Sequence, residues 1–142
     1  MRSDPRNEAI RWLTQAEDEL RDARLLAQQG RYYLALYLSQ QSAEKALKAF
    51  LYSRGLGPLL THSVTSLLQT ASEVDNAFTE LASVGRLDDY YIPTRYPNGL
   101  PGGIPSRYYN DPAEAERATS MSERVVMLVR SLLGLGSPSS KE

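Results

Sequence analysis

Residues 32–52 read YYLALYLSQQSAEKALKAFLY, and they decide the fold because their side chains follow the spacing of an α-helix. One stripe of apolar and small residues runs through Leu36, Ser39, Ala43, Ala46, Leu47, Phe50 and Leu51. Steps of three and four residues place all of them on the same side of a helix. Gly55, Gly57 and Pro58 then break the pattern. The stretch therefore predicts a long amphipathic helix with one buried side.

A second helix is predicted upstream, between Asn7 and Gln29. Its apolar residues recur at the same steps, with charged residues between them. They are Ile10, Leu13, Ala16, Leu20, Ala23 and Ala27. Gly30 follows as a C-terminal stop, and the next helix begins near Tyr32. Two helices joined by so short a turn should pack antiparallel.

Downstream, the pattern predicts shorter helical segments. The Thr61 hydroxyl is a candidate cap for a short helix over residues 64–68. A further helix is expected over residues 74–84, after which Gly85 interrupts it and residues 86–90 add one turn.

The last helix has the clearest start. Asp111 is the expected cap, Pro112 takes the first helical position, and Glu114 is placed to form a capping-box-like pair. The apolar stripe of this helix consists of Ala118, Met121, Val125, Leu128 and Leu132.

No segment shows sustained alternation of period two, so we expect an all-α fold. Its form should be an up-and-down antiparallel helical bundle of four to five helices, with a long Pro/Tyr-rich loop before the last helix. Residues 1–133 should form a single domain, and residues 134–142 a flexible C-terminal tail.

Composition excludes several kinds of site. The 142 residues contain no cysteine and a single histidine, His62, which rules out thiolate and multi-histidine metal sites within one chain, so no metal or cofactor is expected. A net charge of −1 gives no overall attraction to nucleic acid. Without an apolar run of membrane-spanning length or an apolar N-terminal signal, the sequence predicts a cytoplasmic protein with no membrane partner.

The loop of residues 90–110 is the main candidate site. Tyr91, Tyr96 and Tyr108 offer flat rings on which a base can stack, and Arg95 can bind phosphate. The alternative is structural: the rings cover the end of the bundle. Just before the loop, Asp88 and Asp89 are expected to pair with Arg95 or with another loop cation.

A polar face of the residue 32–52 helix is a second candidate. Gln41, Lys45 and Lys48 follow a spacing that places them on one face, away from the apolar stripe, where the two lysines could bind phosphate. The alternative is an ordinary solvated face, on which Glu44 and Lys48 form a surface ion pair.

Three segments resemble, in order, the HEPN domain family. They are Ser39–Phe50 (SQQSAEKALKAF), Thr61–Val64 (THSV) and Tyr91–Pro97 (YIPTRYP), and the resemblance extends from about Glu8 to Leu132. It implies a small bundle similar to the C-terminal domain of kanamycin nucleotidyltransferase, frequently dimeric and often encoded beside a minimal nucleotidyltransferase. Family members are linked to nucleotide binding, or to RNA cleavage within toxin–antitoxin pairs.

Ribonuclease members of the family carry an arginine followed, after four to six residues, by a histidine. The positions that would hold this arginine before His62 are Gly55, Leu56 and Gly57, so the motif is absent. Arg54 lies one position too far away. A cleavage reaction would then require Arg54, His62 and Arg95 to meet in a shared cleft.

We therefore carry three hypotheses. The first is a non-catalytic module that binds a nucleotide, RNA or a nucleotidyltransferase partner, through ligand-binding residues Gln41, Lys45, Lys48, His62, Tyr91, Arg95, Tyr96 and Tyr108. The second is a metal-independent endoribonuclease toxin. The third is a structural dimerisation domain, and a homodimer is also favoured by apolar residues off the main stripes, such as Trp12, Leu25 and Leu34.

Overall fold

A computed structural model of the protein describes residues 4–136. Its elements are α1 (Pro5–Gln28), α2 (Tyr32–Ser53), α3 (Val64–Val74), the 3-10 helices η1 (Asn76–Tyr90) and η2 (Pro97–Gly99), α4 (Pro105–Tyr108) and α5 (Pro112–Leu132). No strand occurs within residues 4–136. The predicted all-α class is confirmed, although the fourth long element is a 3-10 helix and the loop contains the unpredicted α4.

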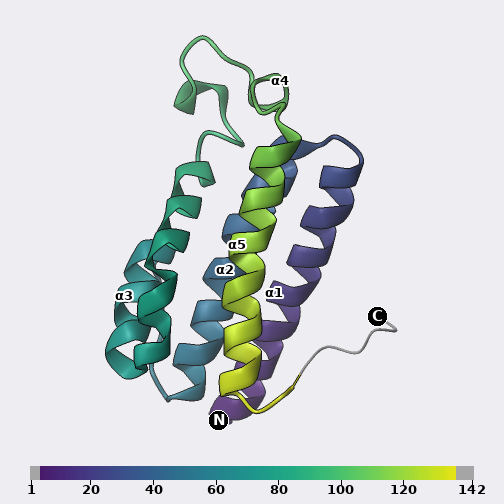
Figure 1. Ribbon diagram of the computed structural model, residues 1–142. Coiled ribbons are helices and arrows are strands. Elements are labelled where there is room, and N and C mark those ends of the chain that lie inside the picture. Colours follow the sequence, from purple (N-terminus) through teal and green to yellow (C-terminus); the bar gives the residue numbers. More distant parts are fainter. Residues whose placement is uncertain (1–3, 137–142) are drawn as a thin grey trace.

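The long helices lie side by side, and the segment between η1 and α5 extends over one end of the bundle (Figure 1). α2 is the central element because it contacts α1, α3, η1 and α5. α3 and η1 pair with each other and cover the flank of α2 opposite α1 (Figure 1).

The core consists of large side chains toward the α3–η1 side and small ones toward α1. The rings of Phe50 and Phe78 lie 4.7 Å apart, and both residues are buried. On the other side, the buried Ser42 hydroxyl donates a hydrogen bond of 2.7 Å to the carbonyl of Ala16. Small residues at this position allow the backbones of α1 and α2 to approach closely.

Two helix starts differ in detail from the prediction. Ser63, not Thr61, caps α3: its hydroxyl accepts from the Ser66 amide, while Thr61 accepts from the Ser63 amide one step earlier. Asp111 caps α5 as expected by accepting from the amide of Ala113.

Glu114 has a partner other than the predicted capping-box amide. Its carboxylate accepts a hydrogen bond of 2.6 Å from the Tyr90 hydroxyl, and so it joins η1 to the first turn of α5.

Gly85 lies inside η1 and does not interrupt it, contrary to the sequence prediction. The reason for glycine here is close packing. A Cβ atom at this position would collide with the side chain of Thr65 on α3 and lie 3.4 Å from its Cα. The missing side chain therefore lets η1 approach α3.

The predicted tail begins at Gly134, and residues 137–142 of it lie outside the described residues. Leu135 packs against the core, and the Arg130 guanidinium donates to the carbonyls of Leu135 and Gly136. Within residues 4–136, no helix combines the length and apolarity needed to cross a membrane.

Candidate functional site

The segment after α2 runs back along the helix it leaves. Near the turn, the Leu59 amide donates to the Tyr52 hydroxyl at 3.4 Å; further on, the Gln40 side-chain amide donates to the His62 carbonyl at 2.8 Å. Gly57 lies against the Tyr52 ring with a φ of +139°, and an added Cβ would lie 2.6 Å from that ring. This path carries His62 back to the middle of α2.

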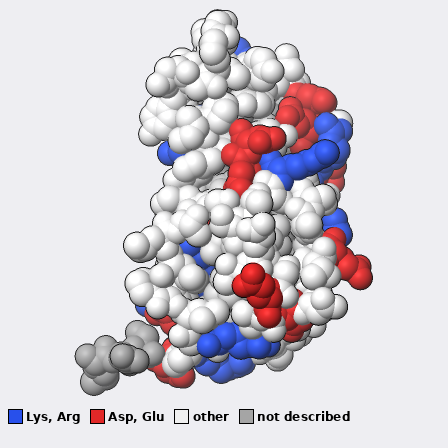
Figure 2. All heavy atoms as spheres, turned by 90° about the vertical axis from the view of Figure 1, so that its left-hand side faces the viewer, with Lys and Arg blue, Asp and Glu red and all other residues white. Residues whose placement is uncertain are grey.

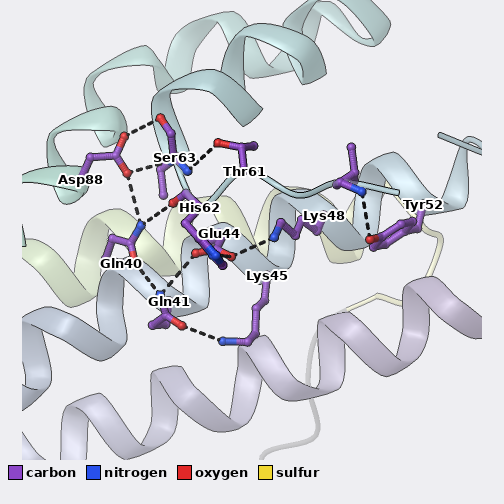
Figure 3. Close-up of polar contacts among 12 residues, drawn as sticks. Gln40, Gln41, Glu44, Lys45, Lys48, Tyr52, Thr61, His62, Ser63 and Asp88 are labelled. Carbon is purple, nitrogen blue, oxygen red and sulfur yellow. Dashed lines mark hydrogen bonds and ion pairs between the residues drawn. The ribbon is translucent and has the colours of Figure 1, made fainter. Parts of the chain in front are cut away.

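Glu44 is the buried centre of the site, with 3% of its surface exposed. Its carboxylate lies 3.0 Å from the Lys48 ammonium, 3.1 Å from His62 Nδ1 and 3.3 Å from the Gln41 amide nitrogen (Figure 3). A buried carboxylate needs such partners because desolvation of a lone charge is costly. The Glu44–Lys48 ion pair is therefore buried, not the surface pair considered from the sequence.

This contact orients His62. An ionised carboxylate only accepts hydrogen bonds, so it favours the proton on Nδ1. In the neutral ring Nε2 is then the acceptor, and 57% of the His62 side chain is exposed. The site presents to solvent one imidazole nitrogen of fixed character.

Asp88 supports the same segment from η1. Its carboxylate accepts from the Ser63 hydroxyl, the Val64 and Thr65 amides and the Gln40 side chain (Figure 3). Burial raises the pKa of Asp88, but these hydrogen bonds outweigh it and the pKa is lowered overall. The expected pairing of Asp88 with a loop cation is wrong, because this carboxylate caps α3 instead.

Arg95 is surrounded by tyrosine rings. Its guanidinium carbon lies 4.6 Å from the ring centre of Tyr91, 4.8 Å from that of Tyr37 and 5.0 Å from that of Tyr96. Its Nε donates to the Tyr91 carbonyl at 2.8 Å. Across the part of the chain that the structure describes, Arg95 has no carboxylate partner, and its terminal nitrogens donate no hydrogen bond.

The two groups meet at Tyr91, whose ring stacks on His62 with centroids 5.5 Å apart and planes inclined by 19°. We call the resulting surface, formed by Tyr37, Glu44, His62, Tyr91, Arg95 and Tyr96, the His62–Arg95 surface. Its hydrogen-bonding groups and cation come from α2, the segment before α3 and the loop after η1.

Most of the predicted ligand-binding residues lie on or beside this surface. Gln41 and Lys48 contact Glu44, whereas Lys45 is held by Glu19 of α1 and by Gln41, each at 3.0 Å. Both lysines therefore have intramolecular partners, and Lys48 is buried.

Two candidate residues lie elsewhere. Tyr108 is exposed on α4, where it contacts the edge of the Tyr109 ring. Arg54 lies over the Phe50 ring and 3.8 Å from Asp75. The structure thus joins His62 to Arg95 through Tyr91 but places Arg54 with other partners.

Sequence reasoning missed Tyr37 and Glu44. Tyr37 precedes Gln41 by four residues, and Glu44 precedes Lys48 by four, so the helical spacing used for the polar face extends to both. Applied over the whole helix, that spacing could have found them.

Within the described residues, no group of three or more His, Asp or Glu side chains is arranged to hold a metal ion.

Comparisons with known proteins agree with this arrangement. The HEPN domain family model matches residues 9–132. The crystal structure of TT1696 from Thermus thermophilus is 36% identical, with a TM-score of 0.81, and the match covers 88% of this chain and 98% of that one. ST0689, an archaeal HEPN homologue, is 32% identical, with a TM-score of 0.73 and coverage of 89% and 98%. No curated protein matches.

Proposed function

Because the chain belongs to the HEPN family, we propose that it is a non-catalytic module that binds a nucleotide on the His62–Arg95 surface. The carrying observation is Arg95, a half-buried guanidinium that three tyrosines hold in place and no carboxylate neutralises within residues 4–136. Its free terminal N–H groups suit the oxygens of a phosphate.

The neighbouring groups suit the rest of a nucleotide. Tyr96 is 49% exposed, so one base can stack on its ring, an interaction worth roughly 1–3 kcal/mol per base. His62 Nε2 can accept from a ribose hydroxyl when neutral and can donate to phosphate when protonated.

Isothermal titration calorimetry with ATP, GTP and a short RNA tests the proposal. Arg95→Met and Tyr96→Ala should each weaken binding about tenfold or more, because each removes one of these contacts. Arg107→Met and Tyr108→Ala are matched controls, since they remove the same residue types from α4. Unchanged affinity in the first pair, with native helicity by circular dichroism, would contradict the proposal.

The Glu44–His62 contact favours a second candidate, metal-independent RNA cleavage. A carboxylate on Nδ1 leaves Nε2 as a base able to take a proton from a ribose hydroxyl. RNA incubated with the protein should then be cleaved, and His62→Ala should abolish the cleavage. Arg54→Ala should have little effect, because Arg54 lies on Asp75. Absence of cleavage by the native protein would leave the binding module as the function.

A further inference from the structure

A second cavity lies on the other side of η1 from the His62–Arg95 surface. Whereas the Tyr91 ring lies on His62, Tyr90 reaches α5 and bonds to Glu114. Beside this bond, the end of η1 and the first turns of α5 enclose a cavity of about 480 Å³. Its lining includes Arg86, Asp89, Tyr90, Glu114, Arg117 and Met121.

The cavity brings together two cations and two anions that do not neutralise one another. No ion pair joins Arg86 or Arg117 to either carboxylate in the described part of the chain. Figure 2 shows acidic and basic side chains beside each other on the upper right of the face it draws, below an end that is almost free of charge. The four charges are therefore arranged around open space in which a ligand could bridge them.

The balance of charge indicates the kind of ligand. A ligand with only phosphate or carboxylate groups would meet Asp89 and Glu114 at close range, and a simple amine would meet the two arginines. Like charges at such distances repel. A molecule that carries both an ammonium and a carboxylate avoids both penalties.

We propose that this cavity binds a small zwitterion with an apolar side chain, the chemistry of an aliphatic α-amino acid. Its carboxylate pairs with the guanidinium groups of Arg86 and Arg117, which suit bidentate binding. Its ammonium donates to Asp89 and to the Glu114 oxygen that Tyr90 leaves free. Its side chain lies on Met121.

Tyr90 keeps Glu114 in place for this role. Burial raises the pKa of Tyr90 first, and the hydrogen bond to Glu114 and its charge raise it further. The hydroxyl therefore remains protonated at neutral pH and continues to donate. The volume lies within the range of about 300–1,000 Å³ usual for small-molecule sites.

L-leucine and two analogues that each lack one charge test the proposal. These analogues are 4-methylpentanoate, without the ammonium, and 3-methylbutylamine, without the carboxylate. Titration of the full chain, followed by calorimetry and by NMR amide shifts, should show that leucine binds and that each analogue binds about tenfold or more weakly. Failure of leucine to bind at millimolar concentration, or equal binding of either analogue, would overturn the proposal.

Variants locate the binding. Arg117→Gln and Glu114→Gln should each weaken leucine binding about tenfold, whereas Arg124→Gln, also on α5 but outside the cavity lining, should not. Arg95→Met should leave leucine binding intact, so a failure of the nucleotide site would not affect this result. Equal affinity in all these variants, with native circular dichroism spectra, would show that leucine binds elsewhere.

Discussion

His62 Nδ1 lies 3.1 Å from a carboxylate oxygen of Glu44, a residue 18 positions earlier in the chain. The same oxygen lies 3.0 Å from the Lys48 ammonium, so a largely exposed imidazole is fixed to a buried ion pair. The site and the core consequently share Glu44, and changes to this residue should affect both.

Glu44→Gln should destabilise the protein strongly. The substitution leaves Lys48, which is 4% exposed, as a buried charge without its carboxylate. Breaking a buried pair in this way costs about 3–5 kcal/mol in the free energy of unfolding. Urea denaturation followed by circular dichroism measures the loss.

The double variant Glu44→Gln/Lys48→Met separates this cause from general disruption. It removes the stranded charge, so it should recover much of the stability lost by Glu44→Gln alone. Glu19→Gln, which breaks the more exposed pair with Lys45, should cost less. Equal stability of the single and double variants would show that the charge is not the cause.

The helices were predictable because their signals are local. The apolar stripe of α2, the stop at Gly30 and the start of α5 at Asp111 and Pro112 each depend on residues a few positions apart. The failure at Gly85 has the opposite character: its packing partner, Thr65, lies 20 residues earlier on another helix. Sequence spacing says nothing of such an approach.

The candidate site was predictable only as a set of residues. Aromatic and basic side chains in the loop indicated Tyr91, Arg95 and Tyr96 from composition alone. Their contacts with Tyr37 and His62 depend on the path of the segments on either side of α3, which pass back over α2. The prediction that Asp88 pairs with a loop cation failed for the same reason, since the true partner is the start of α3.

Asp88→Asn should destabilise α3 and change the response to acid. An asparagine retains one acceptor but places an NH₂ group opposite the donors of Ser63, Val64 and Thr65. Loss of a helix cap costs about 0.5–2 kcal/mol. Chemical denaturation near neutral pH measures the difference in the free energy of unfolding.

The pH dependence follows from the lowered pKa of Asp88. Below its ordinary value of 3.8, the unfolded chain binds the proton before the folded one does, so the stability that Asp88 contributes is lost as pH falls. The native protein should therefore lose more stability than Asp88→Asn between neutral pH and pH 3. Asp89→Asn, the exposed neighbour, is the control and should follow the native curve.

Gly85→Ala should destabilise the contact between α3 and η1. Alanine favours helix by up to about 1 kcal/mol, but its Cβ would collide with Thr65, and overpacking of this kind typically costs about 1–3 kcal/mol. The melting temperature should fall. Thr65→Ala removes the nearest atom, so the two substitutions together should cost less than their sum. Strict additivity would show that Gly85 is needed for another reason.

Tyr90→Phe should lower stability at neutral pH and weaken the loss of stability in alkali. The variant lacks the hydrogen bond to Glu114, which is worth about 0.5–1.5 kcal/mol. Burial, followed by that bond, raises the pKa of Tyr90 above its ordinary value of 10.0. Above pH 10 the unfolded chain therefore loses the Tyr90 proton while the folded chain keeps it, and the free energy of unfolding of the native protein falls.

Phenylalanine cannot titrate, so the stability difference between the native protein and Tyr90→Phe should shrink as pH rises above 10. Tyr37 and Tyr109, whose pKa values burial also raises, remain in both proteins and cancel in this difference. Tyr108→Phe is the matched control because Tyr108 is exposed and its hydroxyl has no partner within residues 4–136. Parallel curves for the native protein and Tyr90→Phe between pH 8 and 11, measured by urea denaturation, would show that Tyr90 ionises equally easily in both states.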